Sequence, residues 1–339
     1  MGFFSRANLH NSLPLLTKEK EVMRKIKFLV MMSELGAGTR GASLGFKALE
    51  TAALNRQNHL FSQYPLEHIT TKNEALYNPI TTPFGKHITD IADVYDHMEQ
   101  GVIRSLNEGY FPVILAGDHS TAGGSIAGFK SVIGPDARLG VIWIDAHADL
   151  HSPHTSPSGN VHGMPVATAI GEDNFLCKRN EIVGETKQAW DRMKGPSPRV
   201  RKSDIAFIAV RDYEKEEAYL MEQYGIPNFT VDQVREYGAA KIAEQVLEYL
   251  SECDAIYVGF DVDALDSSIS IGTGTPVPNG LWPEEVKEMF QEFAAQESVI
   301  GMEMVEVNPT LDNKQNTMAE TALDILVHSI EEFKTPRNA

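Results

Sequence analysis

Three clusters of aspartate and histidine follow apolar stretches of the sequence, and together they could bind metal ions. In an open parallel sheet, residues just past the carboxyl ends of the strands meet along one edge, so clusters that are distant in sequence can converge there. Four carboxylates brought together repel one another unless cations neutralise them, which makes a metal site the simplest interpretation. The six candidate ligands are His119, Asp145, His147, Asp149, Asp261 and Asp263.

The spacing within two clusters suggests how several ligands could reach one place. If Asp145-Ala146-His147-Ala148-Asp149 stays extended, side-chain alternation places its first, third and fifth residues on one side of the chain. Asp261-Val262-Asp263 repeats this spacing with two carboxylates. Each residue taken singly could instead be a helix cap or a turn residue. All six serving only as caps would be a large coincidence, so the metal interpretation is favoured.

The donor set predicts both the metals and a reaction class. Oxygen-rich ligands with two imidazoles suit Mn²⁺, with zinc, iron, cobalt and nickel as alternatives. The carboxylates are numerous enough for two ions bridged by shared aspartates. Two such ions can hold a bridging water and lower its pKa, which supplies hydroxide near neutral pH. The expected chemistry is therefore metal-assisted hydrolysis of an electrophilic carbon or phosphorus.

The sequence segments around these clusters alternate between strand-like and helix-like patterns. This alternation is typical of an α/β fold with a doubly wound, mostly parallel sheet that has helices on both faces. We expect one domain over residues 1–339, with the metal-site core at about 112–310. Expected strands cover 27–32, 113–116, 139–144, 205–210, 255–260 and about 299–305. Expected helices cover about 43–54, 89–107, 185–193 and 317–333, with another beginning near Thr121. A glycine-rich loop over 36–45 should lie at the edge of the site.

Composition narrows the class of protein. Thirty Lys and Arg against 47 Asp and Glu give a net charge of −17, which argues against nucleic acid or an anionic membrane as partner. No apolar run is long enough for a membrane span, and the amino terminus, with Phe3-Phe4, does not resemble a secretory signal. Two cysteines without metal-type spacing suggest a reducing compartment. We therefore expect a cytoplasmic enzyme.

At this point the sequence resembles the ureohydrolase family, and among its members the arginases most closely. The resemblance depends on a series of motifs in matching order between residues 116 and 309, and the set is highly specific. The motifs are Ala116-Gly117-Asp118-His119-Ser120, Asp145-Ala146-His147-Ala148-Asp149, Ser158-Gly159-Asn160-Val161-His162-Gly163, Phe260-Asp261-Val262-Asp263-Ala264-Leu265-Asp266, Gly272-Thr273-Gly274-Thr275-Pro276 and Glu303-Met304-Val305-Glu306-Val307-Asn308-Pro309.

The resemblance implies roles for individual residues and a three-layer α/β/α fold. One manganese would be held by His119, Asp145, Asp149 and Asp261, and the other by His147, Asp145, Asp261 and Asp263. Metal-bound hydroxide would attack the guanidinium carbon, with Asp149 at the catalytic centre. The carboxylate of Glu306 would hold the planar guanidinium, and His162 would be the proton shuttle or general acid for the departing amine. Family members suggest a homo-oligomer, a trimer or hexamer.

Substrate choice depends on the far end of the pocket. The Ser158-Gly159-Asn160 loop matches the one with which arginases bind the α-carboxylate of L-arginine, a group that agmatine lacks. Thr275 and Glu217 would also contact the substrate. Two residues depart from the family pattern. His151 stands in place of an asparagine, and Glu214 replaces an aspartate near the α-amino group, with Glu217 as a residue that could share the role.

Several readings of the function therefore remain open. We expect an arginase that converts L-arginine and water to L-ornithine and urea. Alternatives within the family are an agmatinase, a formiminoglutamase or a guanidinobutyrase-like enzyme. A non-catalytic regulatory relative should have lost ligands, whereas all six are present. A mononuclear zinc deacetylase on a related fold would need neither the six ligands nor Glu306.

Overall fold

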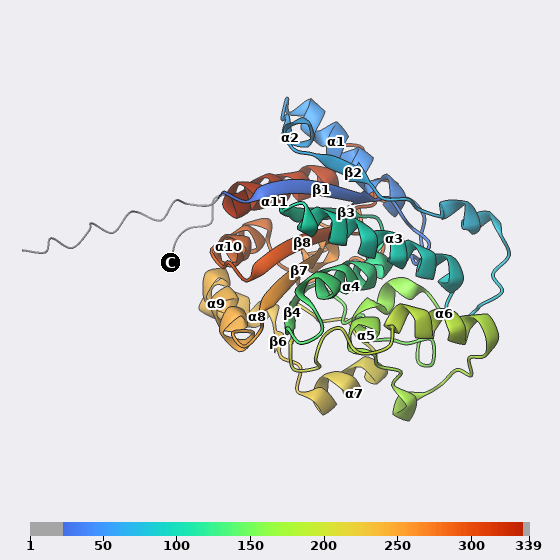
Figure 1. Cartoon of the computed structure of the whole chain (residues 1–339). Helices are drawn as coiled ribbons and strands as arrows, with labels where there is room; N and C mark the ends of the chain where they lie inside the picture. Colours follow the sequence, from blue (N-terminus) through green and yellow to red (C-terminus); the bar gives the residue numbers. More distant parts are fainter. Residues whose placement is uncertain (1–22, 335–339) are drawn as a thin grey trace, which may run out of the picture.

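A single eight-stranded sheet runs through the part of the chain that the structure describes (Figure 1). In this computed structural model, residues 23–334 are described, and the amino-terminal stretch with Phe3-Phe4 lies outside them. The strand order is β2-β1-β3-β8-β7-β4-β5-β6. Every strand pair of this sheet is parallel, so the expected mostly parallel sheet is fully parallel over residues 23–334. The strands are β1 Lys25–Met31, β2 Leu66–His68, β3 Tyr110–Ala116, β4 Leu139–Ile144, β5 Ile205–Ile208, β6 Asn228–Phe229, β7 Ala255–Asp261 and β8 Val299–Val305.

Helices cover both faces of the sheet, which confirms the three-layer α/β/α architecture (Figure 1). One apolar layer joins the sheet to α1 Gly45–Asn55, α2 Leu60–Gln63, α8 Val231–Tyr237, α9 Ala239–Tyr249, α10 Pro283–Ala294 and α11 Thr317–Lys334. The opposite layer contains α3 Ile88–Asn107, α4 Ala122–Ile133, α5 Pro165–Ile170, α6 Gly184–Lys194 and α7 Lys215–Tyr224. That residues 1–339 form a single domain stays a prediction.

The strands other than β2 and β6 are buried along nearly their whole length, as expected when both faces are covered. All six residues of β4 and all seven of β7 are buried. This continuous burial explains why these strands are uninterrupted apolar runs without polar alternation. In β4 and β7 the acidic residues come at or just after the carboxyl end of the strand, and that edge carries the expected ligands.

Short 3-10 turns follow the strands at this edge and carry several of the candidate site residues. They include His119–Thr121 after β3, Val161–Gly163 before α5 and Val262–Ala264 after β7. The others are Ala42–Leu44, Asn73–Tyr77 and Phe175–Cys177. Among the helices of residues 23–334, none is both long and apolar enough to cross a bilayer.

The long excursion between α5 and β5 contains α6, as expected from the sequence near 185–193. Helix α6 buries Trp190 and Met193 and packs against α3 and α5. An ion pair of 2.7 Å between Arg192 and Asp93 adds to this contact. The excursion therefore covers the α3 side of the molecule.

Candidate metal centre and substrate pocket

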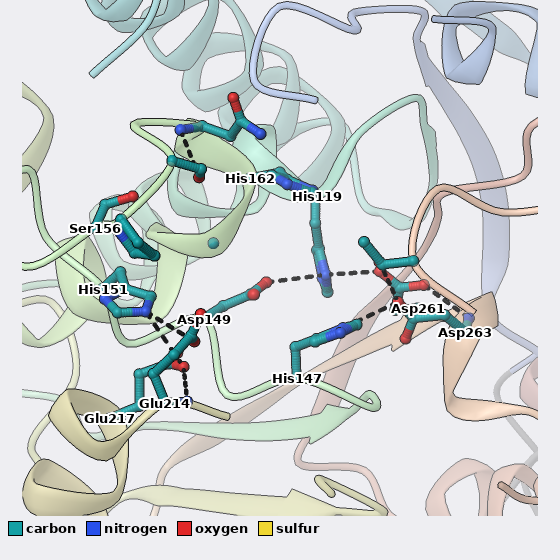
Figure 2. Close-up of a pocket in the computed structure, with 15 residues that line it drawn as sticks. His119, His147, Asp149, His151, Ser156, His162, Glu214, Glu217, Asp261 and Asp263 are labelled. Carbon is teal, nitrogen blue, oxygen red and sulfur yellow. Dashed lines mark hydrogen bonds and ion pairs between the residues drawn. The ribbon is translucent and has the colours of Figure 1, made fainter. Parts of the chain in front are cut away.

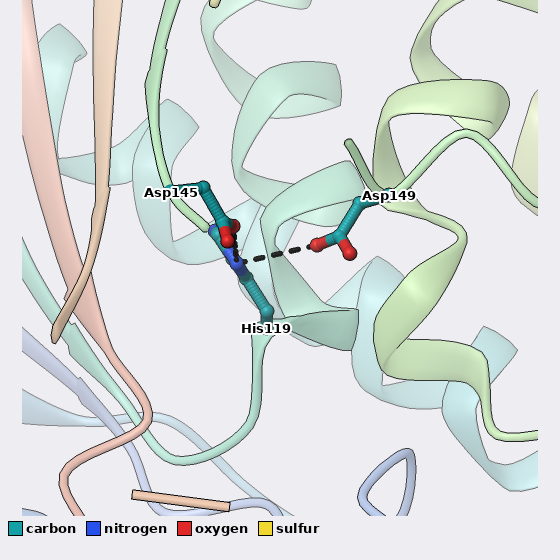
Figure 3. A group of neighbouring side chains, drawn as sticks. All are labelled: His119, Asp145 and Asp149. Atoms are coloured by element: carbon teal, nitrogen blue, oxygen red, sulfur yellow. Dashed lines mark ion pairs between the residues drawn. The ribbon is translucent and has the colours of Figure 1, made fainter. Parts of the chain in front are cut away.

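The six candidate ligands meet at the carboxyl ends of β3, β4 and β7; Figure 2 shows His119, His147, Asp149, Asp261 and Asp263, and Figure 3 shows Asp145. His119 Nδ1 lies 3.0 Å from Asp145 Oδ2, 3.3 Å from Asp149 Oδ2 and 3.2 Å from Asp261 Oδ2. His147 Nδ1 lies 3.0 Å from Asp263 Oδ2 and 3.5 Å from Asp145 Oδ1. Two groups with ligand atoms close together result, and they share Asp145. Figure 3 shows the first group, in which Asp145 and Asp149 approach His119 from different segments.

The way these side chains converge differs from the sequence expectation. Residues 145–147 form a bend and the chain does not stay extended, because Asp145 Oδ1 accepts a hydrogen bond from the backbone N of His147 at 2.6 Å. Asp149 then adopts a left-handed backbone with φ of 50°. In the third cluster, Asp261 Oδ1 likewise accepts from the backbone N of Asp263 at 2.8 Å. These aspartates are thus turn residues and members of the cluster at once, and strand alternation is the wrong explanation for their convergence.

The donor set fits divalent cations. His119 Nδ1 and Asp145 Oδ2 are buried and make no hydrogen bond, although they lie 3.0 Å apart. Buried polar atoms are nearly always paired, so two facing atoms without hydrogen bonds suit a shared ligand ion. The His119 ring is held in place by stacking on Trp143, with ring centroids 4.1 Å apart and an interplanar angle of 5°.

The pKa values of the carboxylates in the cluster also favour cation binding. Burial and repulsion from Asp145 raise the pKa of Asp149 well above its usual value. Burial and repulsion from Asp263 do the same to the pKa of Asp261. Burial alone would raise the pKa of Asp145, but the imidazoles of His119 and His147 outweigh it and hold that pKa low. Carboxylates that resist ionisation together are stabilised when a cation binds among them.

Behind the cluster, His162 pairs with a buried carboxylate. His162 Nδ1 lies 3.3 Å from Glu306 Oε1, and the same oxygen accepts a hydrogen bond from the backbone N of His119 at 3.0 Å. Burial lowers the pKa of His162, but Glu306 outweighs it and the pKa rises to about 9. Glu306 has a left-handed backbone with φ of 66°, a conformation that costs a non-glycine residue about 1–2 kcal/mol. The surrounding packing must hold this strain.

Opposite the metal cluster, a second group of titratable side chains lines the pocket. Figure 2 shows His151, Glu214 and Glu217 on one side of the cavity, with His147, Asp261 and Asp263 across from them. His151 Nε2 lies 3.0 Å from Glu214 Oε2 and 3.5 Å from Glu217 Oε2. His151 Nδ1 lies 3.0 Å from Thr155 Oγ1. The two departures from the family pattern, His151 and Glu214, therefore contact each other.

The charges of this group are unequal. The contact with His151 lowers the pKa of Glu214 to about 2, whereas burial raises the pKa of Glu217 to about 7. Glu217 also anchors the cluster segment, because its Oε1 accepts a hydrogen bond from the backbone N of Leu150 at 3.0 Å. One ionised carboxylate, that of Glu214, is paired with an imidazole and thus faces the cavity from the N-cap of α7.

The remaining expected substrate residues also line the cavity, with one exception. Ser158, Asn160 and Thr275 face it, and Thr275 Oγ1 donates to Asp263 Oδ2 at 3.0 Å. Glu306 does not line it and lies behind His162. Asp145, alone among the candidate ligands, does not line the cavity and is fully buried.

Comparisons with known proteins agree with this geometry. The family model described as the Arginase family matches residues 26–330. An arginase from Bacillus subtilis is 30% identical over 305 residues, covering 89% of this chain and 96% of that protein. The chain belongs to the arginase family. The solved structure of the Bacillus caldovelox arginase matches this ureohydrolase with a TM-score of 0.76 and 30% identity, covering 91% of this chain and 98% of that one.

A more distant structure matches the fold alone. The formimidoylglutamase from Bacillus subtilis is 20% identical with a TM-score of 0.69, and it covers 98% of this chain and 97% of that one. Membership of the arginase family makes the chain an arginase-like hydrolase, an enzyme and not a regulatory relative. The fold by itself does not separate the substrates of such enzymes.

Sequence reasoning missed two residues of the site. Asp118 belongs to the first cluster but points away from the ligands, where its two oxygens accept from the backbone N of Gly36 at 2.9 Å and of Ser120 at 2.8 Å. Burial and the nearby Glu306 raise the pKa of Asp118 to about 6. Lys86 contacts the side chain of Asn160 across 74 positions of sequence. No local pattern could have indicated that contact.

Proposed function

We propose that this ureohydrolase is a binuclear manganese arginase that hydrolyses L-arginine to L-ornithine and urea. The observation that carries the proposal is one cavity lined at one side by all of the candidate ligands except the buried Asp145, and at the other by Ser158, Asn160 and the His151–Glu214–Glu217 group. A substrate in it would place a cationic planar group at the cluster and an amino-acid group at the far side.

The metals would be held as the two groups of ligands suggest. His119, Asp145, Asp149 and Asp261 would bind one ion, and His147 and Asp263 would complete the second, with Asp145 and Asp261 shared. Four carboxylates balance two divalent cations, and oxygen-rich ligands with imidazole suit Mn²⁺ while permitting Co, Ni, Fe or Zn. Bound divalent cations supply Lewis acidity and lower the pKa of a coordinated water.

The protein's own residues would orient the substrate and move protons. A carboxylate beside a guanidinium edge can accept two parallel hydrogen bonds, and this is the role proposed for Glu306 once His162 moves aside. His162 carries a proton at neutral pH, because its pKa lies at about 9. The leaving amine needs that proton, so His162 is the proposed general acid. Its half-buried side chain excludes bulk water from the guanidinium side.

At the other end, the loop supplies donors for a carboxylate. The Ser158 hydroxyl and the Asn160 amide could each donate a hydrogen bond to the α-carboxylate of arginine. The ionised Glu214 would attract the α-amino group, with Glu217 behind it. Agmatine has no carboxylate and would leave the donors unpaired, which costs affinity. The alternatives are other guanidino or formimino substrates that use the same metal centre.

A substrate panel tests this proposal. Manganese-loaded protein is assayed for urea release from L-arginine, agmatine and 4-guanidinobutyrate, and for formamide release from formiminoglutamate. We expect kcat/KM for L-arginine to exceed that for agmatine by at least about 100-fold, which corresponds to the loss of two hydrogen bonds to a charged group. A preference for agmatine or for formiminoglutamate would reject arginase activity and keep the metal centre.

We further propose a homo-oligomer, a trimer or hexamer, in the cytoplasm. This extends the family resemblance to assembly and location. Light scattering of the purified protein gives the subunit number directly, and a monomer at micromolar concentration would reject the oligomer.

A further inference from the structure

We propose that Lys86 is a positioning residue for substrate specificity: it fixes the side-chain amide of Asn160 so that the NH₂ group is the donor offered to a substrate carboxylate, and it adds a positive charge beside that carboxylate. This inference rests on the proposed function for the identity of the guanidino substrate. The inference goes beyond the proposed function because it assigns the preference for a carboxylate to Lys86, which lies far from the Ser158-Gly159-Asn160 loop in sequence.

Lys86 holds the loop through two contacts. Its Nζ donates a hydrogen bond to Asn160 Oδ1 at 3.0 Å, and its backbone N donates to the carbonyl of Gly159 at 2.8 Å. A lysine ammonium has three donors and no acceptor. The amide atom that faces it must therefore be the oxygen.

The orientation of the amide follows from that restriction. With the oxygen turned to Lys86, the NH₂ group is directed to the other side, where it meets Gly38. A Cβ at Gly38 would come within 2.6 Å of Asn160 Nδ2, so a larger residue there would have to displace this amide. Among the hydrogen bonds of residues 23–334, none uses Asn160 Nδ2 as its donor. The amide thus keeps a donor without a partner at the edge of the cavity that Asn160 lines.

Lys86 also keeps its charge free for a ligand. Within the described part of the chain, no carboxylate oxygen lies within 4.0 Å of its Nζ, although the chain carries a net charge of −17. The nearby Asp90 pairs with Lys72 at 3.1 Å. Burial lowers the pKa of His87, and the charges of Arg40 and Lys86 outweigh that of Asp90 and lower it further, which places two cations near this segment besides the Asp90 carboxylate that Lys72 pairs with. An anionic group would be favoured at this rim.

The segment that carries Lys86 is built against the loop. Gly159 has φ of +72°, and a Cβ there would lie 1.9 Å from the carbonyl oxygen of Pro83. The Gly85 N to Thr82 O hydrogen bond of 3.1 Å closes a turn just before Lys86. Backbone contacts from Pro83 to Lys86 therefore fix the distance between the lysine and the Ser158-Gly159-Asn160 loop, and the Lys86–Asn160 contact is part of the scaffold.

Removal of Lys86 frees the amide to rotate. Asn160 could then present its oxygen to the cavity, where it would repel a carboxylate. The group recognised is a carboxylate, and either an α-amino acid such as L-arginine or a plain guanidino acid such as 4-guanidinobutyrate could supply it. Agmatine lacks it and serves as the internal reference.

The test compares Lys86→Met, which keeps the length of the side chain without its charge, with Lys86→Arg and with Lys25→Met. Lys25 is an exposed lysine at the opposite end of β1 from the site. Steady-state constants are measured for L-arginine, 4-guanidinobutyrate and agmatine. For Lys86→Met we expect KM for L-arginine to rise about tenfold, the usual cost of one hydrogen bond to a charged group, with kcat within about twofold.

Constants for agmatine should be unchanged, Lys86→Arg should recover most of the loss, and Lys25→Met should behave as the unmodified protein. A similar tenfold rise with 4-guanidinobutyrate would assign the effect to the carboxylate alone, whereas a rise confined to L-arginine would show that the α-amino group or the one-carbon-longer spacing of arginine is required as well. Both results support the proposal. Equal changes for L-arginine and agmatine, or no change at all, would overturn it.

A binding arm separates this inference from the proposed function. Calorimetry with L-ornithine and putrescine, which differ by the carboxylate, needs no turnover. If the unmodified protein releases no urea from any compound, the proposed function fails. The role of Lys86 is still decided by binding: the unmodified protein should prefer L-ornithine to putrescine, and Lys86→Met should lose this preference. If L-ornithine is not preferred over putrescine by the unmodified protein, the inference is overturned.

Discussion

Replacement of His162 by glutamine isolates the proton-transfer role from the metal site. His162 contacts Glu306 Oε1 at 3.3 Å through Nδ1, and its backbone N donates to the carbonyl of Gly36 at 3.2 Å. A glutamine amide can keep a hydrogen bond to Glu306, but it cannot carry a proton at neutral pH. None of the six candidate ligands is altered. His162→Gln should therefore remove one function and leave the cavity in place.

The size of the effect follows from the protonation state. With a pKa of about 9, His162 is about 97% protonated at pH 7.5, so nearly every molecule has the acid form. A positioned general acid contributes about 10²- to 10⁴-fold to the rate, or roughly 3–5 kcal/mol of the barrier. We expect kcat for L-arginine to fall about 10³-fold in His162→Gln, with bound metal unchanged.

Stability of the chelator-treated protein should change in a defined pH range. The pKa of His162 is raised on folding, so its pair with Glu306 stabilises the folded state fully below about pH 6.5, and this stabilisation is lost as the pH rises through about 9. The shift corresponds to about 3 kcal/mol at low pH. Urea denaturation of the unmodified protein and of His162→Gln at pH 6 and pH 9.5 measures the difference in their free energies of unfolding. This difference should nearly vanish at pH 9.5.

The predicted loss of kcat in His162→Gln is measured as urea release at fixed times, with and without added imidazole. The bound metal of the same samples is also measured. Imidazole should restore part of the lost rate if only a proton donor is missing. Loss of manganese from His162→Gln, or a kcat within about threefold of the unmodified protein, would refute the assignment of His162 as general acid.

Three further changes probe the ligands and the loop. Asp145→Ala should abolish urea release and lower bound manganese by at least about 100-fold in affinity, because both groups share this ligand, while exposed Asp232→Ala should change neither. Ser158→Ala should raise KM for L-arginine about fivefold and leave agmatine unaffected; equal effects would exclude carboxylate binding by the loop. In Gly159→Ala the new Cβ would lie 1.9 Å from the carbonyl oxygen of Pro83, at a residue with positive φ. Its Tm should therefore fall further than that of Gly109→Ala, whose residue also has positive φ (+78°) but has open space around it. Equal losses of Tm would mean that the clash at Gly159 is relieved.

The sequence was sufficient to bring the candidate ligands together because they follow buried parallel strands. Uninterrupted apolar runs indicated β3, β4 and β7, and the edge rule then placed His119, Asp145 and Asp261 side by side. The local geometry was beyond this reasoning. Bends capped by Asp145 and Asp261, which bring the ligands together, depend on side-chain hydrogen bonds that no periodicity encodes.

Other features required tertiary packing to be seen. Strands β2 and β6 have only three and two residues, too few for a periodic signal, and they are formed by pairing at the edges of the sheet. The contact between His151 and Glu214 joins two positions that the sequence analysis treated as separate departures. Their proximity depends on how the start of α7 packs against the segment after β4, where Glu217 accepts a hydrogen bond from the backbone N of Leu150, and residue spacing does not determine this packing.

Titration of chelator-treated protein with Mn²⁺, with urea release from L-arginine measured after each addition, tests the central claim most directly. Because two ligand groups share Asp145, activity should appear only as both fill and should reach its plateau at two equivalents of manganese per chain. A plateau at one equivalent, or full activity without added metal, would contradict a binuclear arginase.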